Sequence, residues 1–234
     1  GLGDVYKRQT GKTPLANRIN YERVMEETIA ALERDGQRPQ LLLHACCAPC
    51  SSCVLEYLSP HFSITAHYYN PNIDTPEEYA HRARELSRFV QEMPLPGAVD
   101  VLAEPYTPAE FYAAVKGLED VPEGGRRCYE CYRLRLRRAA QAAAADGYDY
   151  FTTTLSISPH KNAVWLGELG EAFAAEYGVR WLPSDFKKKN GFKRSTELAA
   201  RYGLYRQDYC GCVFSRREAE ARAARKSAQN KHGA

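Results

Sequence analysis

The spacing of apolar residues along the chain predicts helices that alternate with short buried strands. A helix capped by Asn20 is predicted over residues 20–36. Five short apolar runs are typical of buried strands, at residues 40–45, 62–70, 99–103, 148–157 and 179–183. Helices between these runs are predicted to begin at the capping boxes of Thr75 and Thr107, after Cys128, and at Ser158-Pro159. Two further helices follow the fifth run.

This order of elements predicts an α/β fold, a Rossmann-like three-layer sandwich on a five-stranded, mostly parallel sheet. Right-handed crossovers lead us to expect the strand order 3-2-1-4-5. Ligands of such sheets bind beyond the carboxyl ends of the strands. The unusual residues of this sequence follow those ends, in the segments HACCAPC, YYNPNI, TTTLSISPHK and LPSDFKKK. We therefore expect the functional site at that edge of the sheet.

Composition limits the class of protein. Hydrophobic residues make up 44% of the 234 positions, enough for one sizeable core, and we expect residues 10–228 to form a single domain. No apolar run is long enough to cross a bilayer and no secretory signal is visible, so no membrane partner is expected. The net charge of +3 is small, and its distribution therefore matters more than its sum.

The two ends of the chain are predicted to lie outside this domain. Residues 4–9, DVYKRQ, look like the translation of a transposon-end sequencing adapter, and we interpret residues 1–9 as an artefact. Residues 229–234 are expected to form a disordered tail.

The eight cysteines are the main chemical signal. Without a secretion signal they favour a reducing compartment, and we expect a cytoplasmic protein. Two CxxC pairs could build a structural zinc site, and the pattern alone does not separate zinc from an iron–sulfur cluster. However, eight cysteines exceed the ligands of one zinc ion. If the backbone is extended, Cys46 and Cys47 point to opposite sides and can reach two neighbouring centres.

Six segments together resemble the QueH family of cobalamin-independent epoxyqueuosine reductases: LLLHACCAPCSS, YYNPNI, RRCYECYRLRL, TTTLSISPHKN, SDFKKKNGFKRS and YRQDYCGCVFS. The resemblance covers residues 41–215 approximately and implies a fold related to the adenine nucleotide alpha-hydrolase-like (HUP) group. It implies reduction of epoxyqueuosine to queuosine at the wobble position of tRNA. It also implies a [4Fe–4S] cluster with an additional mononuclear iron nearby.

Carried over by position, the metal ligands implied by this resemblance are Cys46, Cys47, Cys50, Cys128, Cys131, Cys210 and Cys212. We assign the cluster to Cys47, Cys50, Cys128 and Cys131, and the additional iron to the remaining three. Cys53 is surplus to the motif and is left out.

Reductive opening of an epoxide requires proton donors within hydrogen-bond reach of its oxygen. The candidates on strand-end loops are Asp185, Tyr209, His160 and Lys161. For each of them a surface or capping role is the alternative.

A tRNA partner requires basic residues near the site. Candidates for phosphate contacts are Lys187, Lys188, Lys189, Lys193 and Arg194 after the fifth strand, and Arg126 and Arg127 before the second CxxC. The sequence does not identify the electron donor. Two other functions stay open, a zinc-stabilised RNA-binding module and a PP-loop-like tRNA thiolase. The thiolase needs a glycine-rich loop after the first strand, where this chain has HACCAPCSS.

Overall fold

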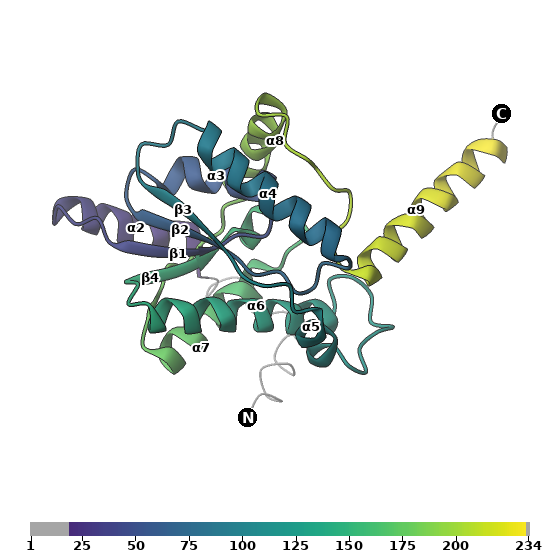
Figure 1. The fold of residues 1–234 in the computed structure, drawn as a ribbon, viewed down its shortest axis with the longest axis horizontal. Coiled ribbons are helices and arrows are strands. Elements are labelled where there is room, and N and C mark those ends of the chain that lie inside the picture. The colour runs from purple at the N-terminus through teal and green to yellow at the C-terminus, as the bar shows by residue number, and fades with distance from the viewer. Residues whose placement is uncertain (1–18, 233–234) are drawn as a thin grey trace.

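The computed structural model describes residues 19–232, with side chains described as far as residue 225. The fold is a parallel five-stranded sheet with helices on both faces (Figure 1). The elements in chain order are α2 (Tyr21–Arg34), β1 (Gln40–His44), α3 (Ala48–Leu58), β2 (Ser63–Tyr68), α4 (Pro76–Glu92), β3 (Val99–Ala103), α5 (Pro108–Ala114), α6 (Arg126–Ala145), β4 (Tyr150–Thr153), a 3₁₀ turn η2 (Thr154–Ile157), α7 (Ala163–Tyr177), β5 (Arg180–Trp181), α8 (Gly191–Arg201) and α9 (Val213–His232).

The sheet has the predicted order, β3-β2-β1-β4-β5. The central strand β1 pairs Leu41 with Ile64 of β2 and with Tyr150 of β4. Successive side chains of a strand point to opposite faces, so Leu41 and Leu43 enter one core while Leu42 enters the other. This explains why β1 is a continuous apolar run rather than an alternating one.

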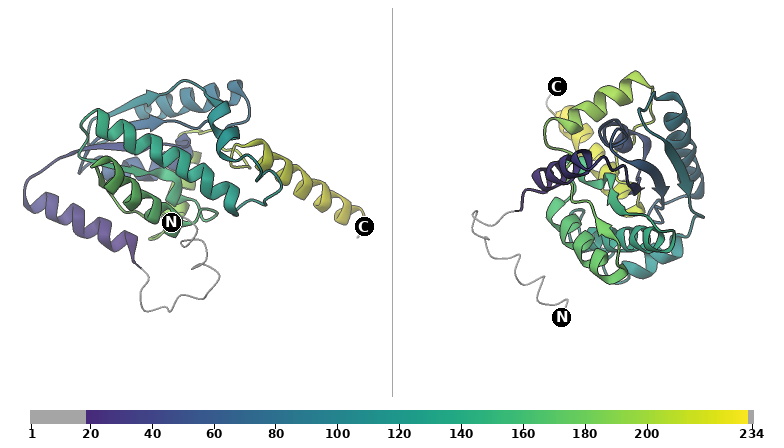
Figure 2. Two further views of the ribbon diagram at one scale, coloured as in Figure 1. Left: turned by 90° about the horizontal axis from the view of Figure 1, so that it is seen from below. Right: turned by 90° about the vertical axis from the view of Figure 1, so that its left-hand side faces the viewer.

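Helices form a layer on each face of the sheet, as Figure 2 shows. Helices α3, α4 and α8 pack together on one face, and α6 and α7 pack together on the other. The predicted three-layer Rossmann-like architecture is therefore confirmed.

Several element boundaries differ from the predictions. The side chain of Thr75 caps α4 by accepting a hydrogen bond from the backbone N–H of Glu78, but Thr107 makes no such bond at α5. Helix α7 begins at Ala163 rather than at Ser158-Pro159, because Asn162 caps it: its Oδ1 accepts hydrogen bonds from the backbone N–H groups of Val164 and Trp165.

The fourth and fifth strands are shorter than predicted. Strand β4 ends at Thr153, the partner of the last residue of β1, and β5 contains only two residues. The pairing of β4 with β1 ends at His44 and Thr153, and residues 154–157 form the 3₁₀ turn η2 instead of continuing the strand.

Helix α9 projects away from the body (Figure 1). It extends to His232, so the backbone of residues 229–232 is helical where we expected disorder. Residues 1–9, interpreted as an artefact, and residues 233–234 lie outside the described residues. None of the helices in the described range has the length and apolar character needed to span a bilayer.

Candidate metal centre

The first group of cysteines gathers where β1 ends. The chain bends at Cys46, and α3 starts at Ala48 with Cys47 as its N-cap residue. The sulfurs of Cys46, Cys47 and Cys50 all lie within 4.8 Å of one another. Cys46 Sγ and Cys47 Sγ are 3.8 Å apart, so the expectation that they point to opposite sides is wrong. The bend at Cys46 breaks the alternation that an extended strand would impose.

The other two groups meet at a small second cavity. Cys128 and Cys131 come from the first turns of α6, and Cys210 and Cys212 come from the turn before α9. All four line this cavity. Burial raises the pKa of the Cys131 thiol to about 12. A bound metal ion is one means by which such a buried thiol becomes a thiolate.

A larger cavity of about 760 Å³ adjoins the small one, and Cys210 and Arg135 line both. Cys46, Cys47 and Cys50 line the larger cavity. The seven predicted ligands therefore line two adjoining cavities at the carboxyl edge of the sheet. Their grouping differs from the expected division, because Cys46 lies with Cys47 and Cys50 rather than lining the small cavity of Cys210 and Cys212.

Strand ends are tied together beneath the first cysteine group. His44 Nε2 lies 3.1 Å from the carbonyl oxygen of Tyr69, and Nδ1 lies 2.8 Å from Thr153 Oγ1. A carbonyl only accepts, so Nε2 carries the proton and Nδ1 accepts from the threonine hydroxyl. Burial, with the nearby Arg135, lowers the pKa of His44 to about 3. The neutral ring thus fixes the ends of three neighbouring strands.

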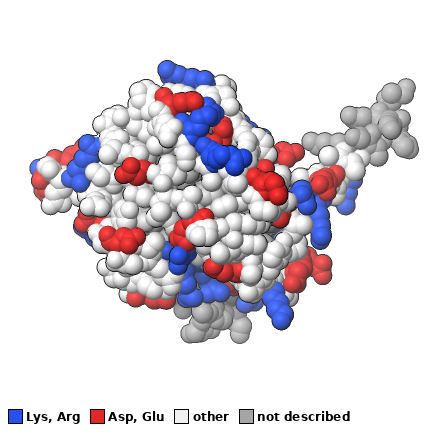
Figure 3. All heavy atoms as spheres, in the orientation of Figure 1, with Lys and Arg blue, Asp and Glu red and all other residues white. Residues whose placement is uncertain are grey.

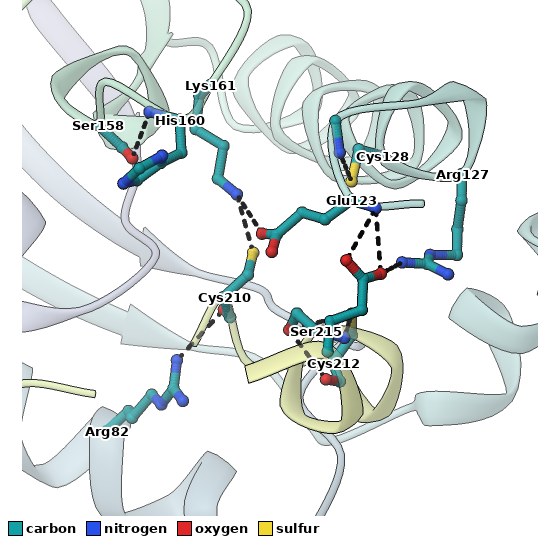
Figure 4. A network of polar contacts seen from close by, with 12 residues as sticks. Arg82, Glu123, Arg127, Cys128, Ser158, His160, Lys161, Cys210, Cys212 and Ser215 are labelled. Atoms are coloured by element: carbon teal, nitrogen blue, oxygen red, sulfur yellow. Dashed lines mark hydrogen bonds and ion pairs between the residues drawn. The ribbon is translucent and has the colours of Figure 1, made fainter. Parts of the chain in front are cut away.

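Lys161 is the most directly placed of the predicted proton donors. Its Nζ donates to Cys210 Sγ at 3.1 Å and lies 3.7 Å from a carboxylate oxygen of Glu123 (Figure 4). Burial disfavours the ammonium, but Cys210, Tyr132 and Cys128 together outweigh that effect, and the pKa of Lys161 rises well above its usual value. Only 8% of the side chain is exposed. A buried ammonium therefore lies beside one of the predicted ligands.

His160 and Tyr209 also line the large cavity, whereas Asp185 does not. The Tyr209 hydroxyl lies 3.4 Å from Asp74 Oδ1, and burial together with Asp74 raises the pKa of Tyr209 to about 12. Asp185 is buried and pairs with Lys187 at 2.6 Å. The structure thus brings three of the four candidates to the cavity.

Comparison with known proteins places this chain in a family. Residues 41–218 match the family model described as epoxyqueuosine reductase QueH. The chain belongs to this family. It is 44% identical over 202 residues to the epoxyqueuosine reductase QueH of Staphylococcus epidermidis, covering 85% of each chain. It is 44% identical over 200 residues to that of Streptococcus pyogenes serotype M1, covering 85% of this chain and 78% of the relative. The relative from Thermotoga maritima is 35% identical over 195 residues, covering 80% and 96% respectively.

The family match includes all seven predicted ligands and most of the cavity, but it ends within the second turn of α9. Arg222, which lines the cavity, lies beyond it. Cys53, left out of the ligand set, is partly buried against the core beside Glu56 and Arg194.

Two cavity residues are buried arginines, Arg82 and Arg135, each 2% exposed. Sequence reasoning missed Arg82, and it considered Arg135 only as one of several basic residues on the helix of the second CxxC that could attract phosphates. Both lie on the buried faces of amphipathic helices. In α4 the buried positions are Tyr79, Arg82, Leu86 and Phe89. An arginine inside an apolar stripe was the available signal, because charged residues are rarely buried without a partner.

The basic residues predicted to bind nucleic acid are mostly engaged within the protein. Three lysines and one arginine after β5 pair with neighbouring side chains: Lys187 with Asp185, Lys188 with Asn20, Lys189 with Glu26, and Arg194 with Glu56. Arg127 is buried, pairs with Glu218 and stacks on Phe214. Lys193 and Arg126 are exposed. Figure 3 shows the resulting mixture of both signs on one face of the molecule.

Proposed function

We propose that this chain reduces epoxyqueuosine to queuosine in tRNA, using thiolate-bound iron at the carboxyl edge of the sheet. The relatives carry the name of that activity. The observation that supports it most is the meeting of cysteines from three distant segments around two adjoining cavities. The reaction takes two electrons and two protons and releases water, so it needs a redox centre and proton donors in one place.

The residues present fit thiolate-bound iron in three respects. Thiolates are ligands that select iron–sulfur clusters, zinc or copper(I) over hard cations. Two thiolates bound to one ion at about 2.3 Å with tetrahedral angles lie roughly 3.8 Å apart, which is the separation of the Cys46 and Cys47 sulfurs. The four thiols of the small cavity equal the ligand number of a [4Fe–4S] cluster.

We therefore revise the division of ligands. Cys128, Cys131, Cys210 and Cys212 would hold the cluster, and Cys46, Cys47 and Cys50 would hold the additional iron, with a coordination position left for substrate. Thiolate-bound iron supplies single electrons at low potential, and an iron with an open position polarises an oxygen ligand.

The chain's own residues supply proton transfer and binding. Lys161 holds a proton at Nζ beside Cys210 Sγ, and His160 lies next to it on the cavity wall. A cavity of about 760 Å³ is large enough to take a nucleoside turned out of the anticodon loop. Phe192, 40% exposed on the same wall, could stack on a base. The exposed Arg206 and Arg222 line the cavity and could contact phosphates.

The test uses the full chain, purified and reconstituted without oxygen. Iron and sulfide are measured, and conversion of epoxyqueuosine-containing tRNA with a chemical reductant is followed by mass spectrometry of the nucleosides. Cys46→Ser and Cys210→Ser should abolish turnover. Lys161→Met should lower kcat while iron is retained. Cys53→Ser, which removes a thiol of the same helix as Cys50, should behave like the wild type. Full turnover by Cys210→Ser, or none by the fully loaded wild type, would refute the proposal.

A further inference from the structure

Two buried arginines at the metal site have incomplete partners. Arg82 lies on α4 and Arg135 on α6, and both line the large cavity. Each is 2% exposed. In each guanidinium the Nη2 group is buried, and among the described residues it has no hydrogen-bond partner. Unpaired buried N–H groups are uncommon in folded proteins, and in a charged guanidinium they are especially unfavourable.

The charge of Arg135 is poorly compensated, whereas Arg82 has one carboxylate partner. Arg82 pairs with Glu78 at 2.7 Å, and its Nη1 lies 3.5 Å from the carbonyl oxygen of Cys210 (Figure 4). Among the described residues, the hydrogen bonds of Arg135 go to neutral oxygens, the carbonyl of Cys131 at 3.3 Å and Asn70 Oδ1 at 3.4 Å, and its guanidinium also lies over the Tyr132 ring. Within the described part of the chain no carboxylate forms an ion pair with Arg135. A buried cation of this kind requires an anion nearby.

The groups that surround these arginines are the predicted sulfur ligands. Arg135 shares the small cavity with all four of its cysteines and the large cavity with the other three. Arg82 reaches the same place from the opposite helical layer, since α4 packs with α3 while α6 packs with α7. Two guanidinium groups thus approach the cysteines from the two faces of the sheet.

We infer that Arg82 and Arg135 are positioning residues for the anionic, thiolate-bound metal centre, to which their unpaired Nη2 groups donate hydrogen bonds. The inference rests on the metal centre of the proposed function, though not on its substrate. Two positive charges beside the centre stabilise its reduced, more negative form, so they make it easier to reduce. They also compensate the charge that the thiolates bring into the interior.

A phosphate of the tRNA is the other anion that could pair with them. The burial of Arg82 and Arg135 argues against pairing with a tRNA phosphate, because the same cavity offers two exposed arginines, Arg206 and Arg222, for that role. Exposed arginines can meet a phosphate as it arrives, whereas the buried pair suits an anion that is present permanently. The two possibilities predict different measurements.

The metal-free and metal-bound chains should respond in opposite ways to Arg135→Met. Without metal, the substitution removes a buried charge that has no carboxylate partner, so the melting temperature should stay the same or rise. With metal, it should speed metal loss to a chelator. A purely structural role for Arg135 predicts lower stability in both forms.

The decisive measurement is the midpoint potential of the reconstituted full chain, titrated under anaerobic conditions and followed by electron paramagnetic resonance. Arg135→Met should lower the equilibrium constant for reduction at least tenfold, a shift of about 59 mV to more negative potential for a one-electron couple. Arg135→Lys should retain most of the wild-type potential. Arg138→Met, which removes a half-exposed charge from the same helix, should leave it unchanged. Arg82→Met should shift it in the same direction as Arg135→Met and provides the test if that variant does not fold.

Wild-type potential and metal retention in both methionine variants, with weaker tRNA binding, would overturn the inference and assign the arginines to phosphate. If the wild type holds zinc rather than iron, the test is the rate of metal loss to a chelator and the melting temperatures of the metal-free and metal-bound chains, each compared between the wild type and Arg135→Met. None of these measurements uses epoxide turnover, so failure of the proposed activity can be told apart from failure of this inference.

Discussion

Replacing Gly211 by alanine tests whether the turn that carries Cys210 and Cys212 is held in one conformation by its backbone. Gly211 has φ +121°, a region that residues with a side chain rarely adopt. A Cβ atom there would lie 3.0 Å from Arg82 Nη1 and 3.4 Å from Ile73 Cγ1. Because Arg82 is itself buried, it cannot move aside freely. The substitution therefore combines backbone strain with a close contact.

The expected cost of Gly211→Ala is about 3 kcal/mol, with roughly 1–3 kcal/mol from the backbone and the rest from displacing Arg82. Gly203→Ala is the matched control, since Gly203 also has positive φ, +56°, but a Cβ there meets nothing within 4 Å. Its expected cost is about 1 kcal/mol. Urea denaturation of the metal-free chains measures both costs. Iron analysis after reconstitution should show a loss only for Gly211→Ala, because its strain falls on the ligand turn. Equal destabilisation and equal iron content in the two variants would refute the reasoning.

Two further predictions concern tRNA binding and pH. Arg222→Gln and Arg206→Gln should each weaken tRNA binding and reduce the slope of the log binding constant against log salt by about 0.7–0.9, with kcat unchanged. Arg34→Gln on α2 is the exposed control. Unchanged slopes in the first two variants would exclude these arginines from the tRNA interface. Burial opposes ionisation of Glu104, but hydrogen bonds from His67 and Arg138 lower its pKa to about 2. The pKa of this carboxyl is higher in the unfolded chain, so the ionised carboxylate stabilises the fold above about pH 4.5 and loses that effect as the pH falls towards 2. The free energy of unfolding should fall by about 2 kcal/mol over that range, after allowance for solvent screening. Urea denaturation of the metal-free chain across that range should show a shallower loss for Glu104→Gln, and identical profiles would contradict this.

The layered fold could be predicted because its signals are local and redundant. Strand β1 is apolar at every central position, since both of its faces are covered, and helical patterns separate it from the next strands. The predicted boundaries were wrong where two nearby residues could each start a helix, or where the ends of the neighbouring strands limit the length of a strand. Ser158-Pro159 and Asn162 are both plausible helix starts, and only the side-chain contacts show which one is used. Residues 154–157 have strand-like composition, but the neighbouring strands have already ended.

The position of the site could be predicted, and its internal arrangement could not. Chain topology brings the ends of β1, β2 and β4 together, so the strand-end rule indicates the edge at which Cys46, Cys47 and Cys50 lie. Cys128 and Cys131 lie in α6, and Cys210 and Cys212 lie before α9, so only the family resemblance implied their place in the ligand set. Whether Cys46 faces Cys47 depends on one bend that leaves no mark in the sequence. The side-chain partners of the basic residues after β5 could not be predicted either. Lys189 pairs with Glu26 of α2 and Arg194 pairs with Glu56 of α3, which are acids far away in the sequence.

The positive charges at the cavity form two sets that differ in burial, and this difference separates their roles. Arg82, Arg135 and Lys161 are buried beside the sulfurs, where little solvent screens them. Arg206 and Arg222 are exposed, and at 0.1 M salt their influence falls off over about 10 Å. A metal centre held by the inner set should therefore keep its affinity and potential as salt rises, while tRNA held by the outer set dissociates.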